Sequence, residues 1–238
     1  KGDLDKETRE TYSVAGIAHV LALSGMHIGI IWLLLRWLKG GLVIPLLWGF
    51  AFIVGLEPSV VRAVVMCMLM ELGRLSGSKV FSMNTLSITA FFMLLYHPFY
   101  LFDVGFQLSF VAVASILFFY PLLFAFLSFK KKMARWTWSV LCVSMAAQLG
   151  TAPLVMYYFS NFSVYFLMTN LVASVLVPFI IYGAILLVMT MPLPGLQHGV
   201  VVMLNGLVAG LNASAEWVSR LPHATFSFSV LNPLEIIV

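Results

Sequence analysis

The sequence predicts an all-α protein, a polytopic bundle of transmembrane helices with about eight spans, short loops and at least one broken or kinked helix. Of its 238 residues, 62% are hydrophobic and 9% are charged, and its mean hydropathy is +1.04. A water-soluble domain carries roughly 25% charged residues, so this chain cannot cover itself with a charged surface. Apolar runs of about 18 or more residues, enough to cross a bilayer, recur along the whole chain. In lipid the backbone must satisfy its own hydrogen bonds, which favours helices.

The spans are predicted from these apolar runs and from the proline and glycine residues that separate them. Residues 1–12 are polar and mixed in charge, and we expect them to be an aqueous lead-in. Eight apolar spans follow, at about 14–38, 42–56, 59–73, 84–97, 104–127, 136–157, 163–191 and 199–219. The loops are short, and no low-complexity linker or clear repeat divides the chain. We therefore expect one transmembrane domain over residues 1–238, excised from a longer chain because it begins at Lys1.

The positions of lysine and arginine predict the orientation. If residue 1 lies outside, the cytoplasmic loops contain eight of these residues and the outer segments four, with Arg62 inside a span. Cytoplasmic loops carry an excess of Lys and Arg, so this bias places both ends outside the cytoplasm. The segment 163–191 leaves two alternatives, because Pro178 interrupts it. One kinked span keeps this orientation, whereas two half-spans would move the C-terminal end to the other side.

Several ionisable and amide side chains lie within the predicted spans, where each needs a partner or a water-filled cavity. They are His19, His27, Arg62, Glu71, Asp103, Gln107, Gln148, Asn170, Asn205 and Glu216. Some have structural explanations, since Arg62 is close enough to a span end to snorkel and Asp103 can cap the helix that follows it. In the predicted topology, however, Arg62, Asp103 and Gln107 all approach from the outer side. One arrangement consistent with this clustering is an Arg62–Asp103 ion pair, which would remove an unpaired charge from the membrane. A second, compatible use is that arginine donors meet an anion.

The stretch from His19 to Leu35 is apolar yet contains two histidines. His19 and His27 are eight residues apart, about 80° around a helix, and Ser24, Gly25 and Gly29 lie between or beside them. The glycine pair permits a close helix crossing, and a break at Gly25 would instead let freed carbonyls line a cavity. The histidines favour the second, water-facing alternative, since a crossing needs no imidazole.

Neither hydrolysis nor metal binding is favoured. Ser24, His27 and Asp103 are the residue types of a nucleophilic triad, but the Gly-x-Ser-x-Gly elbow is missing. The sequence has no His-x3-His or Cys-x2-Cys spacing for a metal and no Gly-x4-Gly-Lys-Ser/Thr loop for a nucleotide, so we expect no cofactor. Cys67 and Cys142 lie inside apolar runs, and we expect them to pack as small apolar side chains rather than to form a disulfide.

Five sequence blocks, in this order, resemble one known family. They are "GIAHVLALSGMHIG" (16–29), "PSVVRAVVM" (58–66), "DVGFQLSFVAVASI" (103–116), "AAQLGTAPLVMYYFSNFSV" (146–164) and "NLVASVLVPF" (170–179). Over essentially the whole chain they are similar to the competence domain of the ComEC family, the inner-membrane DNA channel of natural transformation. The resemblance implies transport of one DNA strand into the cytoplasm while the other is degraded outside. It also implies flanking extracytoplasmic domains, OB-like before this region and metallo-β-lactamase-like after it, so we expect any nuclease activity there.

By motif match, the resemblance points to a set of polar residues along a DNA path. These are His19, Ser24, His27, Arg62, Asp103, Gln107, Ser109, Gln148 and Asn170. We expect a channel domain, not an enzyme, in a bacterial cytoplasmic membrane, with both ends extracytoplasmic. Its expected partners are single-stranded DNA, the bilayer, an extracytoplasmic DNA receptor, and a cytoplasmic ATP-driven motor or single-strand-binding proteins, with a homodimer as one arrangement. The alternative functions are a small-solute transporter and a membrane anchor for flanking soluble nuclease or binding domains.

Overall fold

The computed structural model describes residues 6–17, 25–38, 41–56, 58–77, 83–159, 161–191, 194–222 and 225–227. Its regular structure is almost entirely helical, which confirms the all-α class. The helices are α1 (Lys6–Val14), α3 (Gly25–Leu35), α4 (Val43–Val54), α5 (Pro58–Leu75), α6 (Met83–Tyr96), the 3-10 helix η1 (Pro98–Phe102), α7 (Val104–Ala125), α8 (Lys132–Phe159), α9 (Phe166–Met189) and α10 (Pro194–Ser219). Two short strands, β1 (Asn161–Ser163) and β2 (Thr225–Ser227), pair antiparallel.

Four of these helices are long and apolar enough to cross a membrane. Their qualifying segments are Val104–Ala125, Lys132–Phe159, Phe166–Met189 and Gly195–Ser219. Helices α4 and α6 are apolar but shorter, and α5 carries charged side chains near both of its ends. The seven predicted spans from 42–56 onward each coincide with one helix from α4 to α10, and the first, 14–38, contains α3. The order of the predicted helical segments is therefore confirmed over the described residues.

The N-terminal region differs from the sequence prediction in one respect. The predicted start of the span 14–38 is wrong, because Ala15 and Gly16 form a turn after the end of α1. Within the described residues of this span, the helix is α3 (Gly25–Leu35). Gly16 has a φ of +78°, and a Cβ on it would lie 2.7 Å from the Cβ of Phe166 at the start of α9. Glycine adopts this backbone conformation without strain and leaves room for the neighbouring helix. The turn therefore depends on a local backbone requirement that the hydropathy of the stretch does not show.

Helix α9 continues without interruption through Pro178. Pro121 and Pro153 likewise lie inside α7 and α8. Proline is tolerated in apolar helices where neighbouring helices and side chains compensate for the missing N–H. Residues 166–189 are thus one helix rather than two half-spans, and of the two alternatives this is the one that keeps the orientation predicted from the basic residues.

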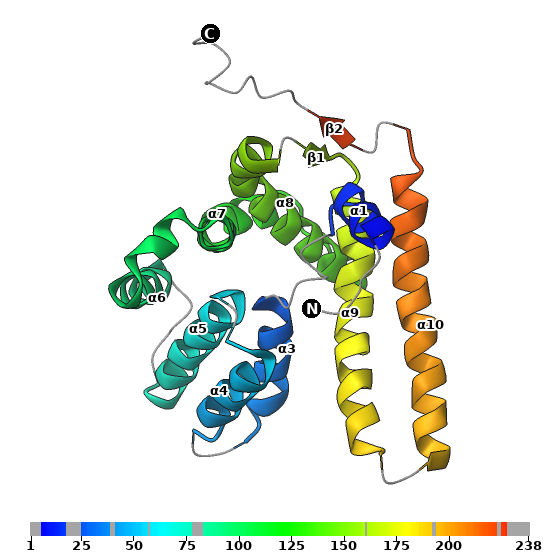
Figure 1. Ribbon diagram of the computed structural model, residues 1–238. Helices are drawn as coiled ribbons and strands as arrows, with labels where there is room; N and C mark the ends of the chain where they lie inside the picture. Colours follow the sequence, from blue (N-terminus) through cyan, green and yellow to red (C-terminus); the bar gives the residue numbers. More distant parts are fainter. Residues whose placement is uncertain are drawn as a thin grey trace.

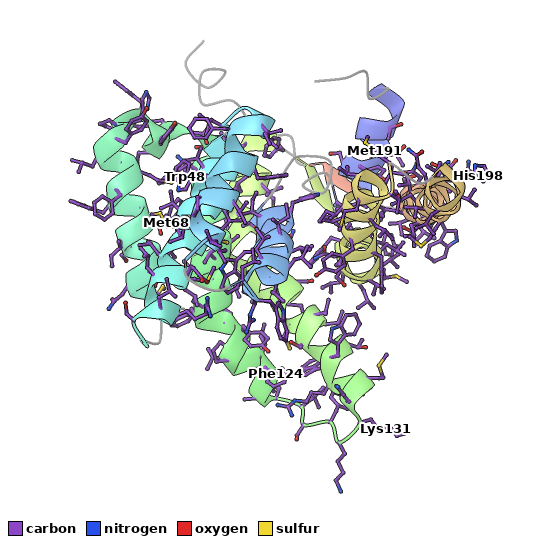
Figure 2. The ribbon with its side chains drawn as sticks, turned by 90° about the horizontal axis from the view of Figure 1, so that it is seen from below. Trp48, Met68, Phe124, Lys131, Met191 and His198 are labelled. Atoms are coloured by element: carbon purple, nitrogen blue, oxygen red, sulfur yellow. The ribbon has the colours of Figure 1, made fainter. Side chains whose placement is uncertain are left out.

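Two helical hairpins form most of the C-terminal half, since α7 packs against α8 and α9 packs against α10. Gly150 lets α8 approach α7 closely, because a Cβ there would lie 2.7 Å from the Cβ of Ser115. In Figure 1, α9 and α10 run from top to bottom while α7 is seen nearly end-on. In Figure 2, where α9 and α10 are seen end-on, the α7–α8 hairpin extends away to its tip near Lys131. The two hairpins therefore cross at a large angle.

Helix α1 and the two strands lie together at one end of the α9–α10 hairpin (Figure 1). The Ser163 hydroxyl of β1 donates to the Val14 carbonyl of α1 at 2.8 Å. The Tyr12 hydroxyl of α1 donates to Oδ1 of Asn212 on α10. Burial raises the pKa of the Tyr12 phenol above its ordinary value, which further favours the protonated form that donates this hydrogen bond. The first and last described segments are thereby joined at the same end of the molecule.

Both cysteines have the environment predicted from the sequence. Cys67 and Cys142 are buried and unpaired. Cys67 packs in the apolar core formed by α3, α4 and α5, together with Ile28, Leu47 and Val64. The thiols thus act as small apolar groups that fill helix contacts.

Candidate polar path through helices α5, α7, α8 and α9

The start of α7 brings an acidic side chain to a buried arginine of α5. Asp103 is the N-cap residue of α7, and its Oδ1 accepts a hydrogen bond from the Phe106 N–H at 2.6 Å, which is the capping predicted from the sequence. Arg62 NH1 lies 3.8 Å from Asp103 Oδ1, so the expected ion pair is present. The Arg62 side chain is 6% exposed, against 46% for that of Asp103. Arg62 therefore does not snorkel to the surface, and Asp103 is the more accessible member of the pair.

The Arg62 guanidinium has unused hydrogen-bonding capacity. Its Nε is buried and has no hydrogen-bond partner in the described part of the chain. Its NH2 lies at the first turn of α7, because a Cβ built on Gly105 would be 3.6 Å from NH2 and 3.2 Å from Asp103 Oδ1. The absence of a side chain at Gly105 thus lets the guanidinium, the carboxylate and the helix backbone meet. A helix N-terminus carries partial positive charge. The positive potential at the start of α7 therefore adds to that of the arginine.

Gln107 lies one turn further along α7 and connects it to α8. Its Nε2 donates to the carbonyl of Leu101 at 2.9 Å. Its Oε1 accepts a hydrogen bond from the hydroxyl of Tyr158 at 2.8 Å. Gln107 is half-buried and Tyr158 is partly exposed, so this contact lies at the edge of the helix interface.

Helix α8 carries a row of polar side chains on one face. Ser144, Gln148, Thr151 and Tyr158 follow one another at intervals of four, three and seven residues. At 100° per residue these positions fall within a sector of about 80°, and at 1.5 Å per residue they extend over about 21 Å. The groups of the row, three hydroxyls and one amide, are neutral hydrogen-bonding groups.

The row reaches α9 at the end away from Tyr158. Asn170 Nδ2 donates to Ser144 Oγ at 2.8 Å. Ser144 and Thr151 also donate to backbone carbonyls four residues earlier in α8, and their hydroxyl oxygens keep the capacity to accept hydrogen bonds, as Ser144 Oγ does from Asn170. Interhelical polar contacts therefore connect α5 to α7, α7 to α8, and α8 to α9 in series.

The structure places the candidate residues selected from the sequence in different environments. Those on the series of contacts or on the polar face of α8 are Arg62, Asp103, Gln107, Gln148 and Asn170. Ser109 is half-buried on α7, two residues and about 200° around the helix from Gln107, so it does not face Tyr158. His27 is half-buried on α3, which packs against α5. His19 and Ser24 lie outside the described residues.

Ser144 and Tyr158 are candidates that the motifs do not reveal. A serine in an apolar helix and a tyrosine near its end are ordinary membrane residues. The available signal is the helical period of the polar positions from 144 to 158. That period applies only because α8 continues as one helix through Pro153.

A second polar cluster joins α3 to α5 at the end of α5 opposite to Arg62. Glu71 is fully buried and accepts hydrogen bonds from Arg74 Nε at 3.0 Å and from Trp32 Nε1 at 3.3 Å. The Arg36 guanidinium lies 5.8 Å from the centroid of the Trp32 ring, a cation–π distance. These partners compensate the buried carboxylate, so Glu71 fixes α3 against α5.

Other features offer less chemistry. Within the ranges that the structure describes, no group of three or more His, Cys, Asp or Glu side chains could hold a metal ion. Glu216 on α10 forms an exposed ion pair with Arg220 one turn later. An open cavity of about 410 Å³ between α4, α5 and α6 is lined by apolar and aromatic side chains such as Trp48, Val65 and Phe92.

Comparison with known proteins places the chain in a defined family. The competence protein family matches it over residues 1–238. Its relatives include ComE operon protein 3 of Bacillus subtilis (strain 168), which is 29% identical over 234 residues, covering 92% of this chain and 28% of that protein. An uncharacterized protein of Aquifex aeolicus (strain VF5) is 30% identical over 201 residues, covering 82% of this chain and 46% of that protein. The chain thus spans less than half the length of either relative. No solved structure matches it.

Proposed function

The chain belongs to the competence protein family, and we propose that it is the membrane domain through which single-stranded DNA crosses the cytoplasmic membrane in natural transformation. The observation that carries this proposal is the neutral polar row of α8, bonded at one end to Gln107, which lies one turn of α7 from the Arg62–Asp103 pair, and at the other end to Asn170. A polyanion cannot cross hydrocarbon, so its path needs groups that replace water around phosphates and bases. Hydroxyls and amides do so without holding the strand tightly, and conduction requires such weak binding.

The shape of the polar row distinguishes this proposal from its rivals. A small-solute transporter concentrates its polar groups in one compact site near the bilayer midplane. A membrane anchor needs no polar contacts from helix to helix beyond those that fix its own packing. A row about 21 Å long on one helix face fits an extended polymer better than either.

The same proposal covers location and partners. We place the domain in the bacterial cytoplasmic membrane with both ends extracytoplasmic, which the continuous helix α9 and the basic α7–α8 tip support. An extracytoplasmic receptor would deliver the DNA, and flanking soluble domains would carry any nuclease activity. A cytoplasmic ATP-driven motor or single-strand-binding proteins would supply the driving force. A homodimer remains one arrangement of the path.

A cysteine substitution at Gln148 tests the path directly. In a background with Cys67 and Cys142 replaced by alanine, Gln148→Cys should react with a bulky water-soluble thiol reagent, and the modified protein should lose uptake of labelled single-stranded DNA. Leu149→Cys is the matched control, since Leu149 is exposed on the neighbouring face of α8, where modification should leave uptake intact. Unchanged DNA uptake after complete modification at Gln148, or uptake of small metabolites but not DNA, would contradict the proposal.

A further inference from the structure

We propose that Arg62 and the first turn of α7 form a binding site for one phosphodiester group of the DNA strand, and that Asp103 occupies this site as an internal counter-ion until the strand displaces it. The inference rests on the proposed function, because it takes the strand as the source of the phosphate. The inference goes beyond the proposed function because it assigns one phosphate-binding site on the path and names Asp103 as the group that occupies this site when no DNA is bound.

The donors of this site converge on a single carboxylate oxygen. Asp103 Oδ1 accepts the Phe106 N–H at 2.6 Å and lies 3.8 Å from Arg62 NH1. A phosphate oxygen in the same place would meet the same two groups. Backbone N–H groups at a helix N-terminus together with an arginine are a recurrent anion-binding arrangement. Because Gly105 has no side chain, Asp103 Oδ1 and Arg62 NH2 can lie close to the helix backbone, at 3.2 and 3.6 Å from where its Cβ would be, and a phosphate that replaces the carboxylate would meet no side chain from this residue.

The buried arginine is the independent sign that a ligand is missing. Its side chain is 6% exposed, and its Nε has no hydrogen-bond partner among the residues described. A buried unsatisfied donor is costly, and at 3.8 Å the Asp103 contact is longer than a hydrogen bond. The charge and the N–H donors of Arg62 are therefore only partly paired in the resting state. A phosphate, which has several oxygens, could accept hydrogen bonds from more of the guanidinium N–H groups.

The accessible position of Asp103 makes exchange feasible. The side chain of Asp103 is 46% exposed, whereas that of Arg62 is buried. An incoming anion therefore meets Asp103 first. Displacing the carboxylate by side-chain rotation would free the Phe106 N–H for the phosphate. Competition by Asp103 also limits how tightly the site holds the strand, which lets the next phosphate replace the last.

Two single substitutions test the proposal because they are expected to act in opposite directions. Asp103→Asn keeps an N-capping side chain but removes the competing charge, so binding of a single-stranded oligonucleotide should tighten by roughly tenfold. Arg62→Gln should weaken binding by about tenfold, and the slope of log affinity against log salt should fall by about 0.7, the value for one phosphate contact on a single strand. Arg62→Lys keeps the positive charge but lacks the planar set of guanidinium donors, so its affinity for the oligonucleotide should lie between those of wild type and Arg62→Gln.

The measurement uses the complete protein in nanodiscs of zwitterionic lipid and a fluorescent oligonucleotide. Glu216→Gln and Arg220→Gln are the matched controls, because they remove the same charges from the exposed pair at the C-terminal end of α10 and should shift affinity much less. Affinity changes of the same sign for Asp103→Asn and Arg62→Gln, or no larger than in the controls, would overturn the proposed site. If the protein binds anionic lipid vesicles in a way that Arg62→Gln weakens, while no oligonucleotide binding depends on Arg62, the site is a lipid site and the proposal is wrong.

Failure of the site and failure of the function give different results. Wild-type protein that binds oligonucleotides and supports DNA uptake, with Arg62→Gln and Asp103→Asn behaving like the α10 controls, removes the site and leaves the proposed function standing. Wild-type protein that neither binds oligonucleotides nor supports uptake removes both.

Discussion

Replacing Gly150 with alanine is expected to separate α7 from α8 and to weaken both stability and transport. A Cβ at this position would lie 2.7 Å from the Cβ of Ser115 and 3.3 Å from Cγ1 of Val111. Carbon atoms make favourable contacts at about 3.5–4.0 Å, so the helices must move apart by about 1 Å. Rotation of the Ser115 hydroxyl cannot relieve the contact, because Cβ does not move with it. Overpacking of this kind costs about 1–3 kcal/mol.

The same displacement has a functional consequence. The Tyr158 hydroxyl donates to Gln107 across the α7–α8 interface at 2.8 Å, and a shift of about 1 Å would stretch this bond beyond hydrogen-bonding range. We therefore expect DNA uptake to fall together with stability. Uptake would be measured with labelled DNA in cells, and stability as the unfolding temperature of the purified protein.

The expected loss in unfolding temperature is about 2–12 °C, since 1 kcal/mol corresponds to about 2–4 °C in a chain of this size. The control is Gly206→Ala on α10, where an added Cβ meets nothing within 4 Å. There alanine should keep or raise the unfolding temperature, because it favours helix over glycine by up to about 1 kcal/mol. Adding Ser115→Gly to Gly150→Ala should restore most of the loss. A Gly150→Ala protein as stable as wild type, or no rescue by Ser115→Gly, would refute the close contact.

Three further substitutions have distinct expected outcomes. Gly16→Ala should lower the unfolding temperature by more than Gly206→Ala changes it, because of its positive φ and the close approach of α9; an unchanged temperature would contradict the turn. Glu71→Gln should destabilise the purified protein more than Glu216→Gln does, because Glu71 is fully buried and its negative charge pairs with Arg74. Equal losses of stability in the two variants would show that the burial of Glu71 does not matter. Tyr158→Phe should cost only about 0.5–1.5 kcal/mol in stability yet reduce uptake of labelled DNA, and normal uptake would remove this residue from the path.

The order of the helices could be predicted from the sequence because it depends on local composition. Each apolar run must be helical in lipid, whatever it packs against. The Arg62–Asp103 pair could also be predicted, since both residues approach from the same side of the predicted topology and an unpaired charge there is costly. The turn at Gly16 could not, because its cause is a positive φ and the nearby Phe166 side chain rather than a change in hydropathy.

Apart from the Arg62–Asp103 pair, the contacts between helices could not be predicted from the sequence. The close approach at Gly150 depends on which residue of α7 faces it, and the large angle between the two hairpins (Figures 1 and 2) depends on packing of both surfaces. Gln107 could be recognised as a polar residue in a span. Its partner Tyr158, 51 positions away, follows only from the α7–α8 register.

The pairing of a charged site with a neutral row has a physical reason within the proposed path. An arginine buried without any counter-ion would bind a phosphate strongly and stall the strand at the entrance. Asp103 weakens that binding by competition, while its capping of α7 holds it in place. Beyond this point the row on α8 contains no charge, so each later contact is weaker than the first. Removing Asp103 should therefore improve capture of DNA and slow its passage, and a variant that captured more DNA and also transported it faster would contradict this division of roles.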